Sequence, residues 1–118
     1  MLVADDEPSV RLLVTETIAM YEYNIVEAAD GDQAWSLIRQ YRPALALLDI
    51  RMPGRSGLEL LRSIKGDPGL AGTKVILLTA SAAQSEVNAG MIAGTDFYLT
   101  KPFSPRELLA RVDEAIAL

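Results

Sequence analysis

The alternation of strand-like and helix-like segments is the feature that most limits which folds this chain can adopt. Short apolar runs typical of buried strands alternate with stretches in which apolar residues recur at helical spacing. The expected strands are residues 1–4, 23–28, 44–49, 74–79 and 96–100, and the expected helices are residues 8–21, 34–41, 57–64, 81–93 and 105–116. Five such βα units predict an α/β domain over residues 1–118, with a parallel sheet and helices on both faces.

The topology of such a sheet is restricted because crossovers between parallel strands are right-handed. We expect a doubly wound sandwich with the flavodoxin-like strand order 2-1-3-4-5, which is common at this size. In these folds the ligand crevice lies beyond the carboxyl ends of the first and third strands, where the strand order reverses. The residues that follow these two strands are therefore the first candidates for a functional site.

Three acidic residues stand at this expected crevice. Asp5 and Asp6 directly follow the first strand, and Asp49 ends the third. A single Asp at a strand end is usually a solvated charge or a helix cap, but three carboxylates together repel and need a counter-charge or a proton. The chain has no histidine and no cysteine, so a metal site here would be built from oxygen ligands, which suit a hard cation such as Mg²⁺.

Two further strand ends supply groups that complement the acids. Thr79 closes the fourth expected strand, and Lys101 follows the fifth. Alone, the first would be read as a strand-end cap and the second as a solvated charge. With the acids they predict a phosphoryl-transfer site. In it Mg²⁺ and Lys101 offset negative charge, Thr79 binds an oxygen, and the Asp49 carboxylate attacks phosphorus.

The composition argues against several other classes of function. The formal net charge is −5 and the basic residues are scattered, so we expect no nucleic-acid binding by this segment. The absence of cysteine excludes disulfides and is compatible with a reducing compartment. No apolar run approaches the roughly 18 residues of a membrane span, and no secretion leader precedes the first strand. We therefore expect a cytoplasmic protein without membrane association.

Four fragments of the sequence, each at the end of an expected strand, resemble the CheY-like receiver domain of two-component response regulators. They are Asp5-Asp6-Glu7-Pro8, Leu48-Asp49-Ile50-Arg51-Met52-Pro53-Gly54, Leu78-Thr79-Ala80 and Tyr98-Leu99-Thr100-Lys101-Pro102-Phe103. Any one fragment is weak by itself. All four in order are highly specific, and the resemblance extends over essentially the whole chain.

The resemblance implies a phosphoacceptor role. Asp49 would accept a phosphoryl group from a histidine on a sensor kinase or a histidine phosphotransfer protein. Asp6, Asp49 and the backbone carbonyl of Arg51 would bind Mg²⁺ directly, Asp5 would act largely through water, and Mn²⁺ could substitute. The domain would catalyse only its own phosphorylation and dephosphorylation, so it would not be an enzyme in the usual sense.

The resemblance also implies a conformational switch, in which Thr79 moves toward the phosphoryl group and Tyr98 turns inward. The residues of the switch and its interface would be Thr79, Tyr98, Lys101, Pro102 and Phe103. The peptide bond between Lys101 and Pro102 would be cis. The last two helices and the strand between them would present a new face, which could also support a homodimer. The alternative for Tyr98 is an ordinary strand aromatic.

Other interpretations remain at this stage. A Mg²⁺-dependent phosphatase or dehalogenase-like hydrolase would need a cap and a second acid two residues after the nucleophile, where this chain has Arg51. A pseudo-receiver would be expected to lose an acid, the threonine or the lysine. Because the first strand is short and the sequence stops just after the last helix, a stand-alone regulator and a domain of a longer DNA-binding regulator or hybrid kinase both stay open, with a slight preference for the second. The Arg51 side chain could pair with the kinase, shield the phosphoryl group or be solvated.

Overall fold

The computed structural model describes residues 1–19, 23–80 and 94–117 and contains a five-stranded parallel sheet. The strands are β1 (Leu2–Ala4), β2 (Val26–Ala28), β3 (Leu45–Asp49), β4 (Lys74–Thr79) and β5 (Phe97–Thr100). The helices are α1 (Pro8–Ile18), α2 (Gly31–Tyr41), α3 (Gly57–Lys65), the short 3₁₀ helix η1 (Pro68–Leu70) and α5 (Pro105–Ala117). The helix expected over residues 81–93 lies outside the described residues.

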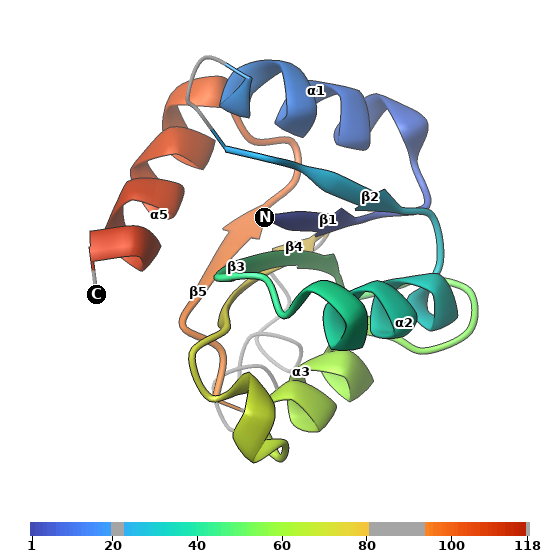
Figure 1. The fold of residues 1–118 in the computed structure, drawn as a ribbon. Coiled ribbons are helices and arrows are strands. Elements are labelled where there is room, and N and C mark those ends of the chain that lie inside the picture. The colour runs from blue at the N-terminus through green and yellow to red at the C-terminus, as the bar shows by residue number, and fades with distance from the viewer. Residues whose placement is uncertain (20–22, 81–93, 118) are drawn as a thin grey trace.

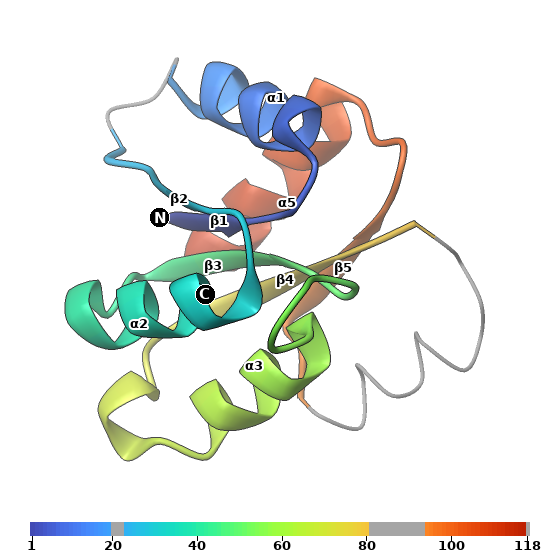
Figure 2. The ribbon, with the colours of Figure 1, turned by 90° about the vertical axis from the view of Figure 1, so that its right-hand side faces the viewer.

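The strand order confirms the expected topology. The sheet runs β2-β1-β3-β4-β5, and each neighbouring pair is parallel. Helices α1 and α5 cover one face of the sheet, and α2 and α3 cover the other (Figures 1 and 2). The order reverses between β1 and β3, so the carboxyl ends of these two strands flank the crevice that this fold provides.

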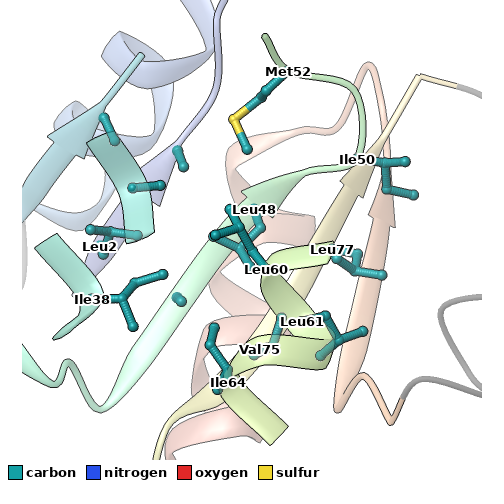
Figure 3. Close-up of a cluster of buried hydrophobic side chains, with 14 of the residues drawn as sticks. Leu2, Ile38, Leu48, Ile50, Met52, Leu60, Leu61, Ile64, Val75 and Leu77 are labelled. Carbon is teal, nitrogen blue, oxygen red and sulfur yellow. The ribbon is translucent and has the colours of Figure 1, made fainter. Parts of the chain in front are cut away.

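The core lies in two layers, one on each side of the sheet. In β3, Leu45 and Leu47 pack with α1 and α5, whereas Ala46 and Leu48 pack with α2 and α3. Figure 3 shows the second layer, in which Leu48 of β3 lies beside Leu60 of α3. Because helices cover both faces, the central strands are apolar on both sides, which explains why they read as continuous apolar runs in the sequence.

Several element boundaries differ from those expected. Helix α2 begins at Gly31 instead of residue 34, because the Asp30 side chain caps it by accepting a hydrogen bond from the Gln33 amide at 2.7 Å. Strand β2 is limited to Val26–Ala28, at the edge of the sheet, where it pairs with β1 alone. The 3₁₀ helix after α3 was not expected. The Asp67 side chain caps it by accepting from the Gly69 amide at 2.8 Å.

Two residues that helical spacing placed on the buried faces are exposed. Tyr41 is 57% exposed at the end of α2, and Ile116 is 43% exposed in the last turn of α5. The helical spacing of apolar residues therefore continues beyond the last residues of these helices that pack against the core. The start of α5 carries a capping box, because Ser104 Oγ accepts from the Glu107 amide at 3.1 Å and lies 3.2 Å from the Glu107 carboxylate.

Candidate functional site

The sheet register brings the candidate residues to one edge of the molecule. Ala4 pairs with Leu48, and Thr79 pairs with Thr100, so the carboxyl ends of the four strands involved lie together. Asp5, Asp49, Thr79 and Lys101 each stand at or just beyond one of these ends. Their convergence follows from parallel strands in this order, although they are far apart in the sequence.

The three acids form one cluster. Asp5, Asp6 and Asp49 each offer a carboxylate oxygen, and these oxygens lie within 4.8 Å of one another. Asp5 and Asp49 are buried, at 0% and 4% exposure, whereas Asp6 is exposed. Backbone amides hold the two buried carboxylates: Glu7 N–H donates to Asp5 Oδ1 at 2.9 Å, and Arg51 N–H donates to Asp49 Oδ1 at 3.3 Å.

Lys101 supplies the counter-charge. Its Nζ lies 2.7 Å from Asp5 Oδ2 and 3.4 Å from Asp49 Oδ2, and it also contacts Glu7 Oε1 at 3.3 Å. Burial by itself would lower the pKa of Lys101, but its contacts with Asp5, Asp49 and Glu7 outweigh burial and raise that pKa. The ammonium group therefore stays charged at neutral pH and bridges the two buried acids.

The backbone around Lys101 fixes the direction of its side chain. The Lys101 amide donates to the Thr79 carbonyl at 2.7 Å, which ties the end of β5 to the end of β4. The Lys101–Pro102 peptide bond is cis, as the resemblance implied. Phe103 is 6% exposed and packs in the α1/α5 layer of the core, whereas Pro102 is exposed.

Asp49 is the acid whose titration is most perturbed. Burial raises its pKa, and the neighbouring Asp5 charge raises it further. The Lys101 charge and the Arg51 amide oppose this rise, and the net result is a pKa of about 7, compared with an ordinary value of 3.8. Near neutral pH the Asp49 carboxyl is thus only partly ionised, and a bound cation would favour the carboxylate.

The donor set fits a hard divalent cation. Asp5 Oδ2 is buried and accepts no hydrogen bond from the described residues, although it makes the ion pair with Lys101. Every ligand on offer from the cluster is an oxygen, which is the chemistry that Mg²⁺ prefers. Asp5, Asp6 and Asp49 are thus the side chains that could hold such an ion.

A cleft of about 280 Å³ opens over this cluster. Its lining residues are Asp6, Glu7, Asp49, Ile50, Arg51, Thr79, Ala80 and Lys101. Thr79 itself is 1% exposed, at the end of β4. The cleft thus combines carboxylates, a hydroxyl group and an ammonium group around a space that could hold a phosphoryl group with its waters.

The structure adds two site residues that the sequence did not single out. Glu7 contacts Lys101 across 94 positions of sequence, a pairing that no local pattern could predict. Gly57, the first residue of α3, approaches the phosphoacceptor candidate closely, because a Cβ built there would lie 2.3 Å from the Asp49 carbonyl oxygen. Its position directly after a Pro- and Gly-containing loop was the available signal.

Two of the candidate switch residues, Thr79 and Tyr98, lie on the neighbouring strands β4 and β5. Tyr98 is on β5 and is 42% exposed, so its side chain faces outward in this structure. Thr79, at the end of the neighbouring strand, is buried. Any inward turn of Tyr98 would therefore be a change from the arrangement seen here.

Comparison with known proteins identifies the family. The family described as "Response regulator receiver domain" matches residues 1–113. The chain is 40% identical over 112 residues to the phosphate regulon transcriptional regulatory protein PhoB of Pseudomonas aeruginosa, a match that covers 95% of this chain and 49% of PhoB. The chain thus spans about half the length of this curated relative.

Solved structures agree with this result. A putative response regulator from Chloroflexus aurantiacus superposes with a TM-score of 0.93 at 31% identity, covering 99% of this chain and 96% of that one. The chemotaxis response regulator CheY4 of Vibrio cholerae gives a TM-score of 0.90 at 27% identity, covering 97% and 95% of the two chains.

The fold and the acidic site define a phosphoacceptor type of signalling domain. The chain belongs to the response regulator receiver domain family, whose members receive signals from histidine kinases in two-component systems. Receiver domains generally bind Mg²⁺, and the acidic cluster described above is where this chain could hold it. In the described part of the chain, no helix is long and apolar enough to cross a membrane.

Proposed function

We propose that residues 1–118 act as one receiver domain that accepts a phosphoryl group on Asp49 from a phosphohistidine donor. The observation that carries this proposal is the placement of the buried Asp49 carboxylate in an open cleft, 3.4 Å from Lys101 and within reach of two further carboxylates. The donor would be a sensor histidine kinase or a histidine phosphotransfer protein, since this chain contains no histidine.

The chemistry follows from the groups in the cleft. An Asp49 carboxylate oxygen attacks phosphorus, the bond between phosphorus and the donor imidazole breaks, and the imidazole leaves with a proton from solvent. Asp6, Asp49 and the Arg51 carbonyl would hold Mg²⁺, with Asp5 acting largely through water. The ion, which Mn²⁺ could replace, would supply neutralising charge to the phosphoryl oxygens. Lys101 is placed to pair with another of these oxygens, and catalysis then consists mainly of positioning and electrostatics.

We propose no second substrate for this site. Arg51 occupies the position where an Asp-dependent hydrolase would carry a second acid, so the chain offers no general acid two residues after Asp49. The reactions we propose are therefore the phosphorylation of Asp49 and the hydrolysis of its acyl phosphate.

Phosphorylation would be signalled by a conformational change at the end of β4 and on β5. The Thr79 hydroxyl would move toward the phosphoryl group, and Tyr98, which faces outward here, would turn into the space released. The proposed output face, which comprises β5, α5 and the helix expected over residues 81–93 outside the described residues, would then change shape. It could bind an output partner or a second copy of the domain. Lys101, Pro102 and Phe103 link the site to this face.

We propose no nucleic-acid contact for these residues, whose net charge is −5. The relative PhoB is a transcriptional regulator by name, so a DNA-binding function would belong to a segment outside this sequence. Because response regulators are typically cytoplasmic, we place the chemistry in that compartment.

The test is the intact mass of the protein after incubation with acetyl phosphate, with and without Mg²⁺. We expect a gain of one phosphoryl group that needs Mg²⁺ and is absent in Asp49→Ala. The control is Asp113→Ala, which removes an exposed carboxylate of α5 and should leave phosphorylation unchanged. If a folded wild-type protein gained no mass, and also gained none from a histidine-phosphorylated donor protein, the pseudo-receiver interpretation would replace this proposal.

A further inference from the structure

The loop between β3 and α3, residues 50–56, lies against the first turn of α2 (Figure 1). The Gly31 amide of α2 donates a hydrogen bond to the Pro53 carbonyl at 2.9 Å. The contact is so close that a Cβ built on Gly31 would lie 1.8 Å from the carbonyl oxygen of Arg55. This loop therefore depends on α2 for its shape.

A side-chain contact also joins this loop to α2. The Arg55 guanidinium carbon lies 5.3 Å from the centroid of the Trp35 ring, a distance at which a cation–π attraction operates. Trp35 is on α2 and packs partly against the core layer beneath it. Arg55 also approaches Asp32 at 3.7 Å, but that ion pair is exposed and contributes little.

The loop also carries groups of the acidic site. Arg51, four residues before Arg55, donates its amide to Asp49 Oδ1 and would offer its carbonyl to the metal. Ile50 and Met52 are anchored in the core, where Figure 3 shows both side chains, and the Gly57 amide closes the loop on the Ile50 carbonyl at 2.9 Å. The loop is thus held beside the acidic site by its core residues and at α2 by Arg55, and Arg51 lies within this short segment.

We propose that Arg55 and Trp35 are positioning residues for the metal site, because their contact holds the β3–α3 loop in the shape that presents the Arg51 carbonyl. This inference rests on the proposed function, since it concerns the binding of the divalent ion which that function uses. Coupling between two sites is reciprocal, so metal binding should in turn tighten the Arg55–Trp35 contact. Trp35 is the single tryptophan of the chain and would report that change.

The direction of the change in Mg²⁺ affinity, when Arg55 is replaced, distinguishes a positioning role from a purely electrostatic one. Removing the positive charge of Arg55 should strengthen the binding of a cation nearby if charge alone mattered. If the contact positions the loop, removing it should weaken Mg²⁺ binding by about two- to fivefold, the range expected for the loss of an exposed cation–π contact.

The experiment measures Mg²⁺ affinity from the amide NMR shifts of Arg51 in wild type, Arg55→Ala and Arg55→Lys. The matched control is Arg39→Ala. Arg39 approaches the same ring, at 5.9 Å, but belongs to α2 and not to the loop. We expect weaker binding in Arg55→Ala, an intermediate value in Arg55→Lys because a lysine lacks the planar stacking group, and an unchanged value in Arg39→Ala. The Trp35 emission should respond to Mg²⁺ in wild type and lose most of that response in Arg55→Ala.

The possible outcomes distinguish the positioning role of Arg55 and Trp35 from the phosphoacceptor function. Equal or stronger Mg²⁺ binding by Arg55→Ala, or a Trp35 emission that saturating Mg²⁺ leaves unchanged in wild type, would overturn the positioning role and leave the phosphoacceptor function standing. The absence of any Mg²⁺-dependent shift in wild type would refute the metal site and the positioning role together. Thermal unfolding of each variant without Mg²⁺ shows that the fold is retained.

Discussion

Replacing Asp49 by Asn should stabilise the metal-free protein at neutral and higher pH. The carboxyl of Asp49 is buried beside Asp5, and its pKa in the folded protein is raised from 3.8 to about 7. As pH rises above about 4, the unfolded chain releases this proton while the folded chain keeps it. The folded state then binds more protons than the unfolded state, so the free energy of unfolding falls until pH passes the folded-state pKa.

The size of this decrease in the free energy of unfolding follows from the pKa shift of Asp49. At about 1.4 kcal/mol per pKa unit, the gap corresponds to roughly 4 kcal/mol. Because the charge is shared with Asp5 and Lys101, we expect Asp49→Asn to gain roughly 2–4 kcal/mol above about pH 7 and almost nothing near pH 4. For a domain of this size the gain would raise Tm by on the order of 10 °C.

The assay is thermal unfolding followed by circular dichroism from about pH 4 to about pH 8.5, with a chelator present. The control is Asp6→Asn, because Asp6 belongs to the same cluster but is exposed, so water already screens its charge. Addition of Mg²⁺ should stabilise wild type more than Asp49→Asn and so shrink the difference. A variant no more stable than wild type at about pH 8, or a gain independent of pH, would refute the reasoning.

Three further substitutions test the packing that positions the site. Gly57→Ala should destabilise the fold by on the order of 3 kcal/mol and slow phosphorylation, because its methyl group would meet the Asp49 carbonyl at 2.3 Å; unchanged urea unfolding would contradict this. Leu48→Ala should cost about 2–5 kcal/mol in the same assay, since Leu48 is fully buried, and a cost under about 1 kcal/mol would show that the core relaxes there. Ser104→Ala should lose about 1 kcal/mol through the α5 cap, whereas equal stability would mean that the cap hydrogen bond is replaced by water.

Much of the fold could be predicted because the buried strands leave a strong signal. β3 and β4 are apolar on both faces, and Asp49 marks the end of β3 although it is itself buried. The alternation of strands and helices also predicted the strand order, since right-handed crossovers leave few possible topologies for a parallel sheet. The ends of elements were less predictable, as at α2, where Asp30 caps a helix that begins at a glycine.

The location of the site could be predicted from strand ends, but its internal contacts could not. The sequence predicted that Asp5, Asp49 and Lys101 would lie at one edge of the sheet, because each stands at or just after the end of a strand of one parallel sheet. It did not predict that Glu7 shares the Lys101 ammonium group, or that the β3–α3 loop rests on α2 through Trp35. These contacts join residues distant in the chain and depend on loop geometry, which has no periodic signature in a sequence.

Locating the phosphorylated residue chemically is the most direct test of Asp49 as the phosphoacceptor. After reaction with acetyl phosphate and Mg²⁺, borohydride would reduce an aspartyl phosphate to homoserine, and peptide mass spectrometry would show its position. We expect homoserine at position 49, with Asp5 and Asp6 intact. Homoserine at position 5 or 6, or phosphate retained on a hydroxyl such as that of Thr79, would contradict the central claim that Asp49 is the phosphoacceptor.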